Sequence, residues 1–134
     1  LVSLIDLAPT IVTAAGAAPL STMRGCALQE LVEGTAADWP QDIFVQISES
    51  QCGRAIRTKK WKYSVRAPEK TGDDPDSDVY VEDFLYDLEV DPHERQNLVA
   101  SPAHLEIRQE LAGTLKRRMV NAGERAPEIR PAAS

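Results

Sequence analysis

The chain has 134 residues, 43% of them hydrophobic, and a formal net charge of −6. This length can bury one modest core, which favours a small globular unit. The acidic balance argues against a nucleic-acid partner, because phosphate binding needs clustered Lys and Arg side chains. No apolar run approaches the ~20 residues that a membrane span requires, so we expect a soluble chain with no membrane partner.

Cysteine and histidine give little support for a metal site or a disulfide framework. Cys26 and Cys52 permit one disulfide at most. His93 and His104 could be imagined as ligands or general bases, but neither has a Cys or His partner at ligand spacing, which favours surface helix positions. The chain begins at Leu1 without an initiator Met, so localisation stays open.

Two helices are expected near the start of the chain. The first spans residues 6–15, with Asp6 positioned to cap its start and Gly16 positioned to end it. Its apolar stripe consists of Leu7, Ile11 and Val12. A short second helix is expected near residues 28–33. Residues 1–35 therefore form a helical segment.

Four strands are expected after a linker. Residues 43–47 alternate in hydrophobicity, which is typical of a strand with one apolar face. Residues 53–58 and 61–66 are separated by two lysines, and this spacing predicts a tight hairpin. Residues 68–78 contain five acidic side chains with Pro and Gly, which predicts a flexible loop. The last strand is expected over residues 79–88.

A long helix is expected from Ser101 to about Asn121. Its apolar stripe consists of Leu105, Ala112, Leu115 and Met119, with Ile107 and Leu111 beside them. The side chains expected to face outward are Glu106, Arg108, Glu110, Lys116 and Arg117. Residues 123–134 are rich in Pro, Ala and charge without periodicity, so we expect a disordered tail there.

These elements predict an α+β fold. The simplest way to bury them is an antiparallel sheet of about four strands, covered on one face by the long C-terminal helix. One or two N-terminal helices precede this sheet. The resulting α+β subdomain takes in residues 36–122.

The stretch 84–98 is the most informative part of the sequence, because a strand ends there at a recognisable corner. Asp91 is positioned to cap a helical turn, Pro92 suits the first helical position, and Glu94 completes a pattern similar to a capping box. Asn97 tolerates a left-handed exit, so we expect the helical turn to be short.

Four segments of the chain carry a family signature. Its residues are Asp6, Pro9 and Thr10 in the first helix, Gly25 in the following turn, Arg57, Lys62 and Tyr63 in the strand pair, and Tyr86, Asp87, Leu88, Asp91, Pro92, Glu94, Asn97 and Leu98 at the corner. In this order the segments resemble the C-terminal region of the sulfatase family, in the alkaline-phosphatase-like hydrolase superfamily. Cys26 stands where the family usually has Ser. Ordered matches over residues 1–122 seldom arise by accident.

The resemblance implies a parent enzyme that hydrolyses sulfate esters. Such enzymes use a formylglycine nucleophile, made inside a C/S-x-P-x-R motif, and a divalent cation, usually calcium. Neither Cys26 nor Cys52 has Pro two residues later and Arg four residues later. We therefore expect a C-terminal fragment with no catalytic residue, no metal ligand and no cofactor of its own. Its partner would be the missing N-terminal catalytic domain, on which, as the resemblance implies, the helical segment 1–35 would pack.

The turn between the first two strands carries the candidate residues for a substrate-pocket rim, Glu49, Gln51 and Arg54. In sulfatases, as the resemblance implies, loops at one end of this sheet can border the substrate pocket. Arg54 could pair with a sulfate or a carboxylate through its planar fork. The alternative is that Arg54 pairs with Glu49 across the hairpin. The basic residues from Arg54 to Lys62 are otherwise expected on a solvated sheet face.

Aromatic and acidic residues each allow a functional and a structural interpretation. Five rings could form a carbohydrate platform, but their placement in strands favours the sheet core or an inter-domain contact: Trp39, Trp61, Tyr63, Phe84 and Tyr86. Alternating acids could suggest a calcium loop, but the Gly and Glu of an EF-hand are missing, which favours a solvated loop: Asp73, Asp74, Asp76 and Asp78.

Two classes of function stay open at this point. The chain is either the C-terminal subdomain of a hydrolase of sulfate esters, or of related phosphate or phosphonate esters, or a non-catalytic interaction module on the same scaffold. In both cases the apolar stripe of the first helix needs a cover. We expect it to fold back onto the sheet or, preferably, to form a homodimer.

Overall fold

The computed structural model describes residues 1–132, which belong to two compact units. The first unit is Leu1–Ile43 and the second begins at Phe44. The sequence placed this boundary earlier, at residue 35. The linker belongs to the first unit because the indole Nε1 of Trp39 donates to the carbonyl oxygen of Leu1 at 2.7 Å.

The first unit contains the two predicted α-helices, and a 3-10 helix that the sequence did not predict precedes the first of them. They are η1 (Leu4–Asp6), α1 (Leu7–Ala14) and α2 (Leu28–Val32). Gly16 follows α1 with a φ of 76°, a left-handed conformation that glycine adopts without strain.

Side chains of the first signature segment tie α1 to the turn before α2. Asp6 Oδ1 accepts from the backbone N–H of Cys26 at 2.9 Å, and Thr10 Oγ1 accepts from that of Leu28 at 2.9 Å. Gly25 approaches the backbone of η1 so closely that a Cβ would overlap it. These contacts explain why the first two signature segments occur together at this spacing.

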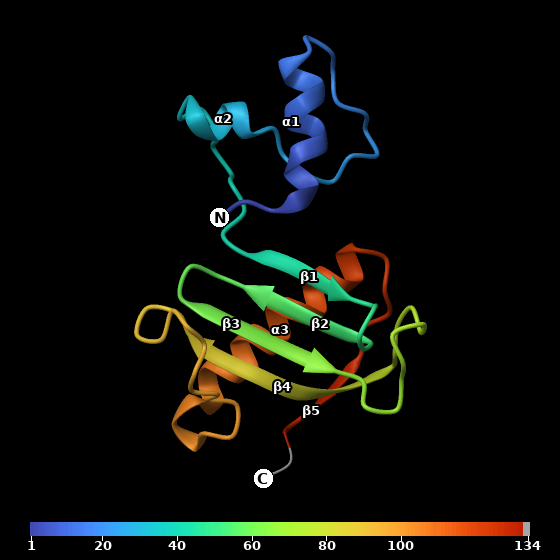
Figure 1. The fold of residues 1–134 in the computed structure, drawn as a ribbon, viewed down its shortest axis with the longest axis vertical. Coiled ribbons are helices and arrows are strands. Elements are labelled where there is room, and N and C mark those ends of the chain that lie inside the picture. The colour runs from blue at the N-terminus through green and yellow to red at the C-terminus, as the bar shows by residue number, and fades with distance from the viewer. Residues whose placement is uncertain (133–134) are drawn as a thin grey trace. The chain divides into compact units, whose positions relative to one another are not determined.

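The second unit is built on a five-stranded sheet in the order β1-β2-β3-β4-β5 (Figure 1). The strands are β1 (Ile43–Ile47), β2 (Gly53–Arg57), β3 (Trp61–Arg66), β4 (Val79–Asp87) and β5 (Glu128–Arg130). The pairs β2/β3 and β3/β4 are antiparallel, whereas β4/β5 is parallel. The pairing skips Asp83, which lies between the partners of Ser64 and Val65, and this marks a bulge in β4.

Strand β5 lies in the segment that the sequence assigned to a disordered tail. Glu128 donates its backbone N–H to Asp78 at 2.9 Å, and Ile129 pairs with Tyr80 and packs against the core. Three residues are too few to show a hydrophobic period, so the pattern did not reveal the strand. The sheet is therefore mixed and five-stranded rather than antiparallel and four-stranded.

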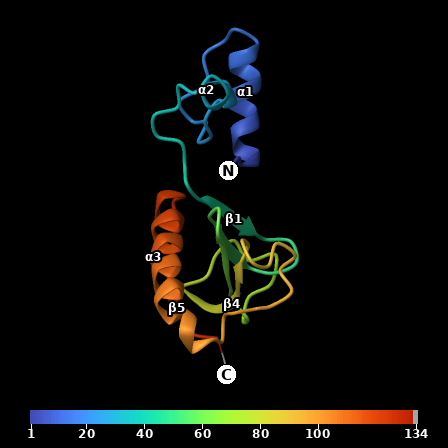
Figure 2. The same ribbon diagram turned by 90° about the vertical axis from the view of Figure 1, so that its left-hand side faces the viewer.

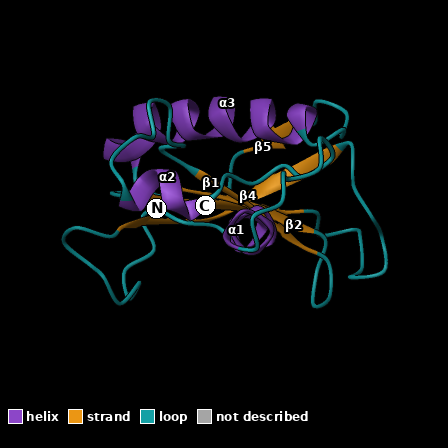
Figure 3. Cartoon of the chain, turned by 90° about the horizontal axis from the view of Figure 1, so that it is seen from above, coloured by secondary structure: helices purple, strands orange, loops and turns teal. Residues whose placement is uncertain are grey.

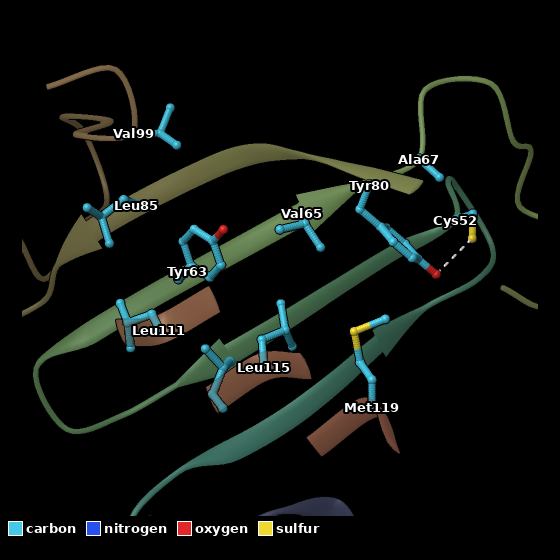
Figure 4. Packing of buried hydrophobic residues seen from close by; sticks show 11 residues of the cluster. Cys52, Tyr63, Val65, Ala67, Tyr80, Leu85, Val99, Leu111, Leu115 and Met119 are labelled. Atoms are coloured by element: carbon cyan, nitrogen blue, oxygen red, sulfur yellow. Dashed lines mark hydrogen bonds between the residues drawn. The ribbon is translucent and has the colours of Figure 1, made fainter. Parts of the chain in front are cut away.

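Helix α3 (Leu105–Asn121), preceded by η2 (Pro102–His104), covers one face of the sheet (Figures 2 and 3). Its side chains Leu111, Leu115 and Met119 are buried against the strands (Figure 4). The strands contribute Ile56, Tyr63, Val65, Tyr80 and Leu85 to this core, and the turn before β2 contributes Cys52. The α+β architecture with a long C-terminal helix is thus confirmed.

Arg108 lies inside this layer, although the sequence placed it on the outer face of the helix. It is 9% exposed, and Nη1 donates to Glu82 Oε2 at 2.6 Å. The hydroxyl of Tyr63 donates to the other oxygen of Glu82 at 3.2 Å. Helical periodicity could not predict this position, because the compensating charge comes from β4. Leu105, expected in the apolar stripe, is instead 50% exposed.

The corner after β4 consists of hydrogen-bonded turns, and the expected helical turn is absent from it. Asp91 Oδ2 accepts from the backbone N–H of Gln96 at 2.8 Å, so its side chain caps a turn. The left-handed residue is Glu94, with a φ of 55°, rather than Asn97. The carboxylate of Glu94 accepts from Lys62 Nζ at 2.5 Å, which helps to hold this conformation.

Asn97 attaches the corner to β4. Its Oδ1 accepts from the backbone N–H groups of Leu85 at 3.0 Å and Val99 at 3.1 Å. Its Nδ2 donates to the carbonyl oxygen of Asp83 at 2.9 Å. The side chain therefore replaces a missing strand partner along part of β4.

Candidate functional site

Three polar segments meet at one end of the sheet, which we call the loop end. They are the β1–β2 turn (48–52), the β3–β4 loop (67–78) and the segment after α3 (122–127). Antiparallel pairing of β2, β3 and β4 brings the turn and the loop to the same end. The candidate rim residues Glu49 and Gln51 belong to this end.

Arg54, which lies in β2 just after the turn, ties the other two segments to the sheet. It is 1% exposed, and its Nε donates to Glu124 Oε1 at 2.8 Å. Its Nη1 donates to the carbonyl oxygen of Gly53 at 2.7 Å, and its Nη2 to that of Pro75 at 2.6 Å. Burial opposes the charged guanidinium, but the hydrogen bond to Glu124 and nearby negative charge together raise the pKa of Arg54. All three nitrogens are thus engaged inside the protein.

Glu124 is the partner that sequence reasoning missed. Its Oε1 accepts from Arg54 and also from Gln46 Nε2 at 2.7 Å, while Oε2 is buried without a partner among the described residues. The alternative pairing of Arg54 with Glu49 is wrong in this structure. No sequence signal marked Glu124, since it stands after α3 in a segment that was expected to be disordered.

Tyr80 packs beside Arg54 and completes the buried part of the loop end. The guanidinium carbon of Arg54 lies 5.9 Å from the centroid of the Tyr80 ring. The Tyr80 hydroxyl lies 3.7 Å from Cys52 Sγ and accepts from the backbone N–H of Ser77 at 3.1 Å. Burial, followed by the contact with Cys52, raises the pKa of Tyr80. The Cys52 thiol has no exposed surface.

Glu49 and Gln51 stand at the outside of this assembly. Glu49 is exposed and Gln51 is half-buried. Gly72, in the β3–β4 loop, lies so close to the backbone carbonyl of Glu49 that a Cβ would overlap it. The loop therefore packs directly on the turn and fixes the backbone that carries the two polar side chains.

A hollow of about 280 Å³ lies between the β3–β4 loop and β5. Charged residues of both signs line it, namely Glu69, Lys70, Asp78 and Arg130. Arg130 is paired with Glu128 at 2.9 Å, and Lys70 with Asp74 at 3.2 Å. Because both cations are paired, the hollow presents no net positive charge for an anion.

Within residues 1–132, no group of three or more His, Cys, Asp or Glu side chains could hold a metal ion. His104 stacks edge-on against Trp61 with ring centroids 6.0 Å apart, and its Nδ1 lies 2.9 Å from Ser101 Oγ. The acidic loop is organised by Asp74, which accepts from the backbone N–H of Thr71 at 2.9 Å. No described helix combines the length and apolar character needed to cross a bilayer.

Comparison with solved structures shows the same fold in larger proteins. BT4656, solved with its substrate D-glucosamine-2-N,6-O-disulfate, is 24% identical over 91% of this chain and 24% of its own, with a TM-score of 0.72. BT1596, a 2-O GAG sulfatase, is 22% identical over 88% of this chain and 24% of its own, with a TM-score of 0.69. The phosphonate monoester hydrolase of Agrobacterium radiobacter is 22% identical over 87% of this chain and 24% of its own, with a TM-score of 0.67.

The fold is therefore that of a domain found in sulfatases and related hydrolases, and this chain spans about a quarter of the length of these proteins. The family model described as N-sulphoglucosamine sulphohydrolase, C-terminal, matches residues 1–121. The chain belongs to this family. No match was found among curated proteins.

Proposed function

We propose that this chain is the C-terminal subdomain of a hydrolase that cleaves sulfate esters. The observation that carries the proposal is the family match over residues 1–121. The substrate in the BT4656 structure, a sulfated amino sugar, supports sulfate esters as the substrate class. The likeness to a phosphonate monoester hydrolase supports phosphonate or phosphate esters as the second candidate.

In this proposal the chain supplies scaffold and pocket rim, and the reaction centre lies elsewhere in the parent. Formylglycine and a divalent cation, usually calcium, would supply the nucleophile and polarise the leaving group when bound there. The residues of this chain do not fit either group. Cys52 is fully buried, and the backbone of Cys26 is bonded to Asp6 in a structural turn.

Glu49 and Gln51 are the proposed rim residues, with Arg54 acting behind them. Glu49 is exposed at the loop end and is free to meet a hydroxyl or amine of a substrate. Arg54 does not offer its fork to a sulfate, because its three nitrogens are engaged inside the protein. Its proposed role is to position the turn that carries Glu49 and Gln51.

Kinetics of the full-length parent test the rim. Glu49→Gln and Gln51→Ala should raise KM several-fold with little change in kcat, since rim contacts bind the ground state and transition state alike. Glu106→Gln, an exposed position on α3, is the matched control and should change neither constant. Unaltered KM values in both rim variants would remove Glu49 and Gln51 from the pocket.

A further inference from the structure

Residues 122–132, which we call the C-terminal strap, lie outside the region that matches the family model, since that region ends at residue 121. The strap leaves α3 at Gly123, whose φ of 99° is a conformation that favours glycine. It then runs to the edge of the sheet, where β5 pairs in parallel with β4 (Figure 1). The strap therefore adds contacts to strands that lie inside the matched region.

The first contact of the strap compensates a buried charge. Glu124 accepts from Nε of Arg54 at 2.8 Å, and the Arg54 side chain is 1% exposed. Among residues 1–132, Glu124 is the one carboxylate that pairs with Arg54. A buried charge that loses its partner is costly, because water does not replace the missing group. Strand β2 therefore depends on a side chain of the strap.

The second contact lies at the far end of the strap. Ile129 and Ala132 pack against the hydrophobic core. The backbone N–H of Ala132 lies 3.4 Å from Oε2 of Glu82, the same oxygen that accepts from Arg108 at 2.6 Å. The strap is therefore attached at both of its ends, and each attachment contacts a buried ion pair.

A short series of contacts leads from the strap to the proposed rim. Arg54, held by Glu124, donates through Nη2 to the carbonyl oxygen of Pro75 in the β3–β4 loop. Gly72 of the same loop lies so close to the backbone of Glu49 that a Cβ would overlap it. Because a guanidinium group is planar, fixing its Nε also fixes the direction of its Nη2. Loss of Glu124 should therefore release the loop and, with it, the backbone of the β1–β2 turn.

The loop end has no regular structure that would order it in another way. Residues 48–52 and 67–78 contain no helix or strand. Loops of this kind are mobile unless side-chain contacts hold them. The buried guanidinium of Arg54 is the contact that joins the strap to the β3–β4 loop.

We propose that the C-terminal strap orders the loop end, and that Glu124 is a positioning residue for the rim residues Glu49 and Gln51, acting through Arg54. The role at the rim rests on the proposed function, whereas the ordering of the loop end does not. In this proposal the strap acts on substrate binding through the β1–β2 turn, without touching the substrate itself.

NMR relaxation of the backbone amides of the 134-residue chain tests the ordering without any activity measurement. In the unaltered chain, residues 48–52 and 71–77 should have order parameters near the ~0.85 of rigid backbone. In Glu124→Ala these values should fall below about 0.6, the range of flexible segments. The measurement is made where each chain is fully folded, so a change in global stability alone does not alter it.

Two controls separate ordering of the loop end from a general effect. Residues 88–98, in the corner after β4, should keep their order parameters in Glu124→Ala. Glu128→Ala, which removes an exposed partner of Arg130 in the same strap, should leave the loop end unchanged. Unchanged order parameters at the loop end in Glu124→Ala, or an equal fall in the corner, would overturn the proposal.

A milder variant decides the matter if Glu124→Ala does not fold. Glu124→Gln keeps an acceptor oxygen for Arg54, but the charge-assisted hydrogen bond becomes a neutral one of roughly half the strength. A smaller fall in order parameters, confined to the loop end, would support the proposal. No fall in this variant would overturn it.

Kinetics of the full-length parent test the role at the rim. Glu124→Gln should raise KM several-fold with little change in kcat, because a displaced rim weakens binding of the ground state and transition state alike. Glu128→Gln is the matched control and should change neither constant. An unaltered KM in a variant whose loop end is disordered would overturn the positioning role of Glu124. A parent that hydrolyses no sulfate ester would contradict the proposed function, and the order parameters would still decide whether the strap orders the loop end.

Discussion

Arg54 illustrates how one buried charge can organise a polar end of a sheet. Its guanidinium donates to Glu124 and to two backbone carbonyl oxygens from different segments. A buried ion pair gives little net stability over an apolar substitute, but removing one partner leaves the other charge uncompensated. The contribution of this ion pair to stability is therefore best measured by removing Arg54, Glu124, and then both.

Arg54→Ala should lower the free energy of unfolding by about 3 to 5 kcal/mol, because Glu124 is left buried and unpaired. Glu124→Ala should be destabilising for the same reason, and the double variant should cost less than the sum. Urea denaturation measures all three. Arg57→Ala is the control, because Arg57 is exposed on the same strand. If Arg54→Ala lowers the free energy of unfolding as little as Arg57→Ala does, Arg54 does not hold the loop end together.

We expect the folded state to lose stability at alkaline pH because two tyrosine side chains are buried. Burial, followed by the charge of Glu82, raises the pKa of Tyr63, and burial also raises the pKa of Tyr80. In the unfolded chain these phenols ionise near pH 10. The folded state then holds more protons, so stability is full below about pH 10 and falls as pH rises above it.

Denaturation midpoints measured between about pH 8 and about pH 11 test whether stability falls as pH rises. Phenolate absorbance over the same range reports the ionisation of the tyrosines. The folded protein should show fewer tyrosinates at the upper pH than the urea-unfolded chain. Tyr63→Phe should flatten the pH dependence. Equal phenolate signals from folded and unfolded protein would contradict the burial of these rings.

At the scale of elements, the corner after β4 depends on side-chain caps rather than on a helix. Asp91→Ala should cost about 1 kcal/mol, because the backbone N–H of Gln96 loses its acceptor. A domain of this size should then melt a few degrees earlier. His93→Ala, exposed in the same turn, is the control, and an unchanged melting temperature in Asp91→Ala would exclude a capping role.

Strands β1 to β4 and the long helix could be predicted because each is at least five residues long and can show a hydrophobic period, whereas β5 is too short to do so. The corner could not, since Asp91, Pro92 and Glu94 suit the start of a helix and a non-helical turn equally well. Glu94 then adopts the left-handed conformation with support from Lys62, a partner far away in sequence.

The candidate site was predictable only in its exposed half. The polar turn with Glu49 and Gln51 was visible as a break between two periodic strands. The buried half depends on Glu124 and Pro75, which reach Arg54 across 70 and 21 positions of sequence. Local sequence patterns carry no information on such long-range pairs. For this reason the sequence suggested that Arg54 binds a substrate anion, whereas in the structure it binds groups of the protein itself.

For the whole molecule, the first helical segment predicts self-association. Leu4, Ile5, Leu7 and Ile11 are between 46% and 84% exposed, and covering such side chains is favourable by ~25 cal/mol per Å². We therefore expect a two-fold dimer through this segment at micromolar concentration. In a sedimentation experiment, the Ile11→Lys variant should be a monomer. The control variant Arg24→Lys should sediment like the unaltered chain. If the unaltered chain is itself a monomer, the proposed dimer does not form.

Under the proposed function, this chain is part of a sulfate-ester hydrolase whose reaction centre lies outside residues 1–134. The most direct measurement compares hydrolysis of an activated aryl sulfate, with calcium present, by the 134-residue chain and by the full-length parent produced with its formylglycine-forming enzyme. We predict turnover by the parent and none by the 134-residue chain. Turnover by the 134-residue chain that scales with its concentration and survives repurification would contradict the claim, as would a formylglycine-loaded parent that hydrolyses no sulfate ester.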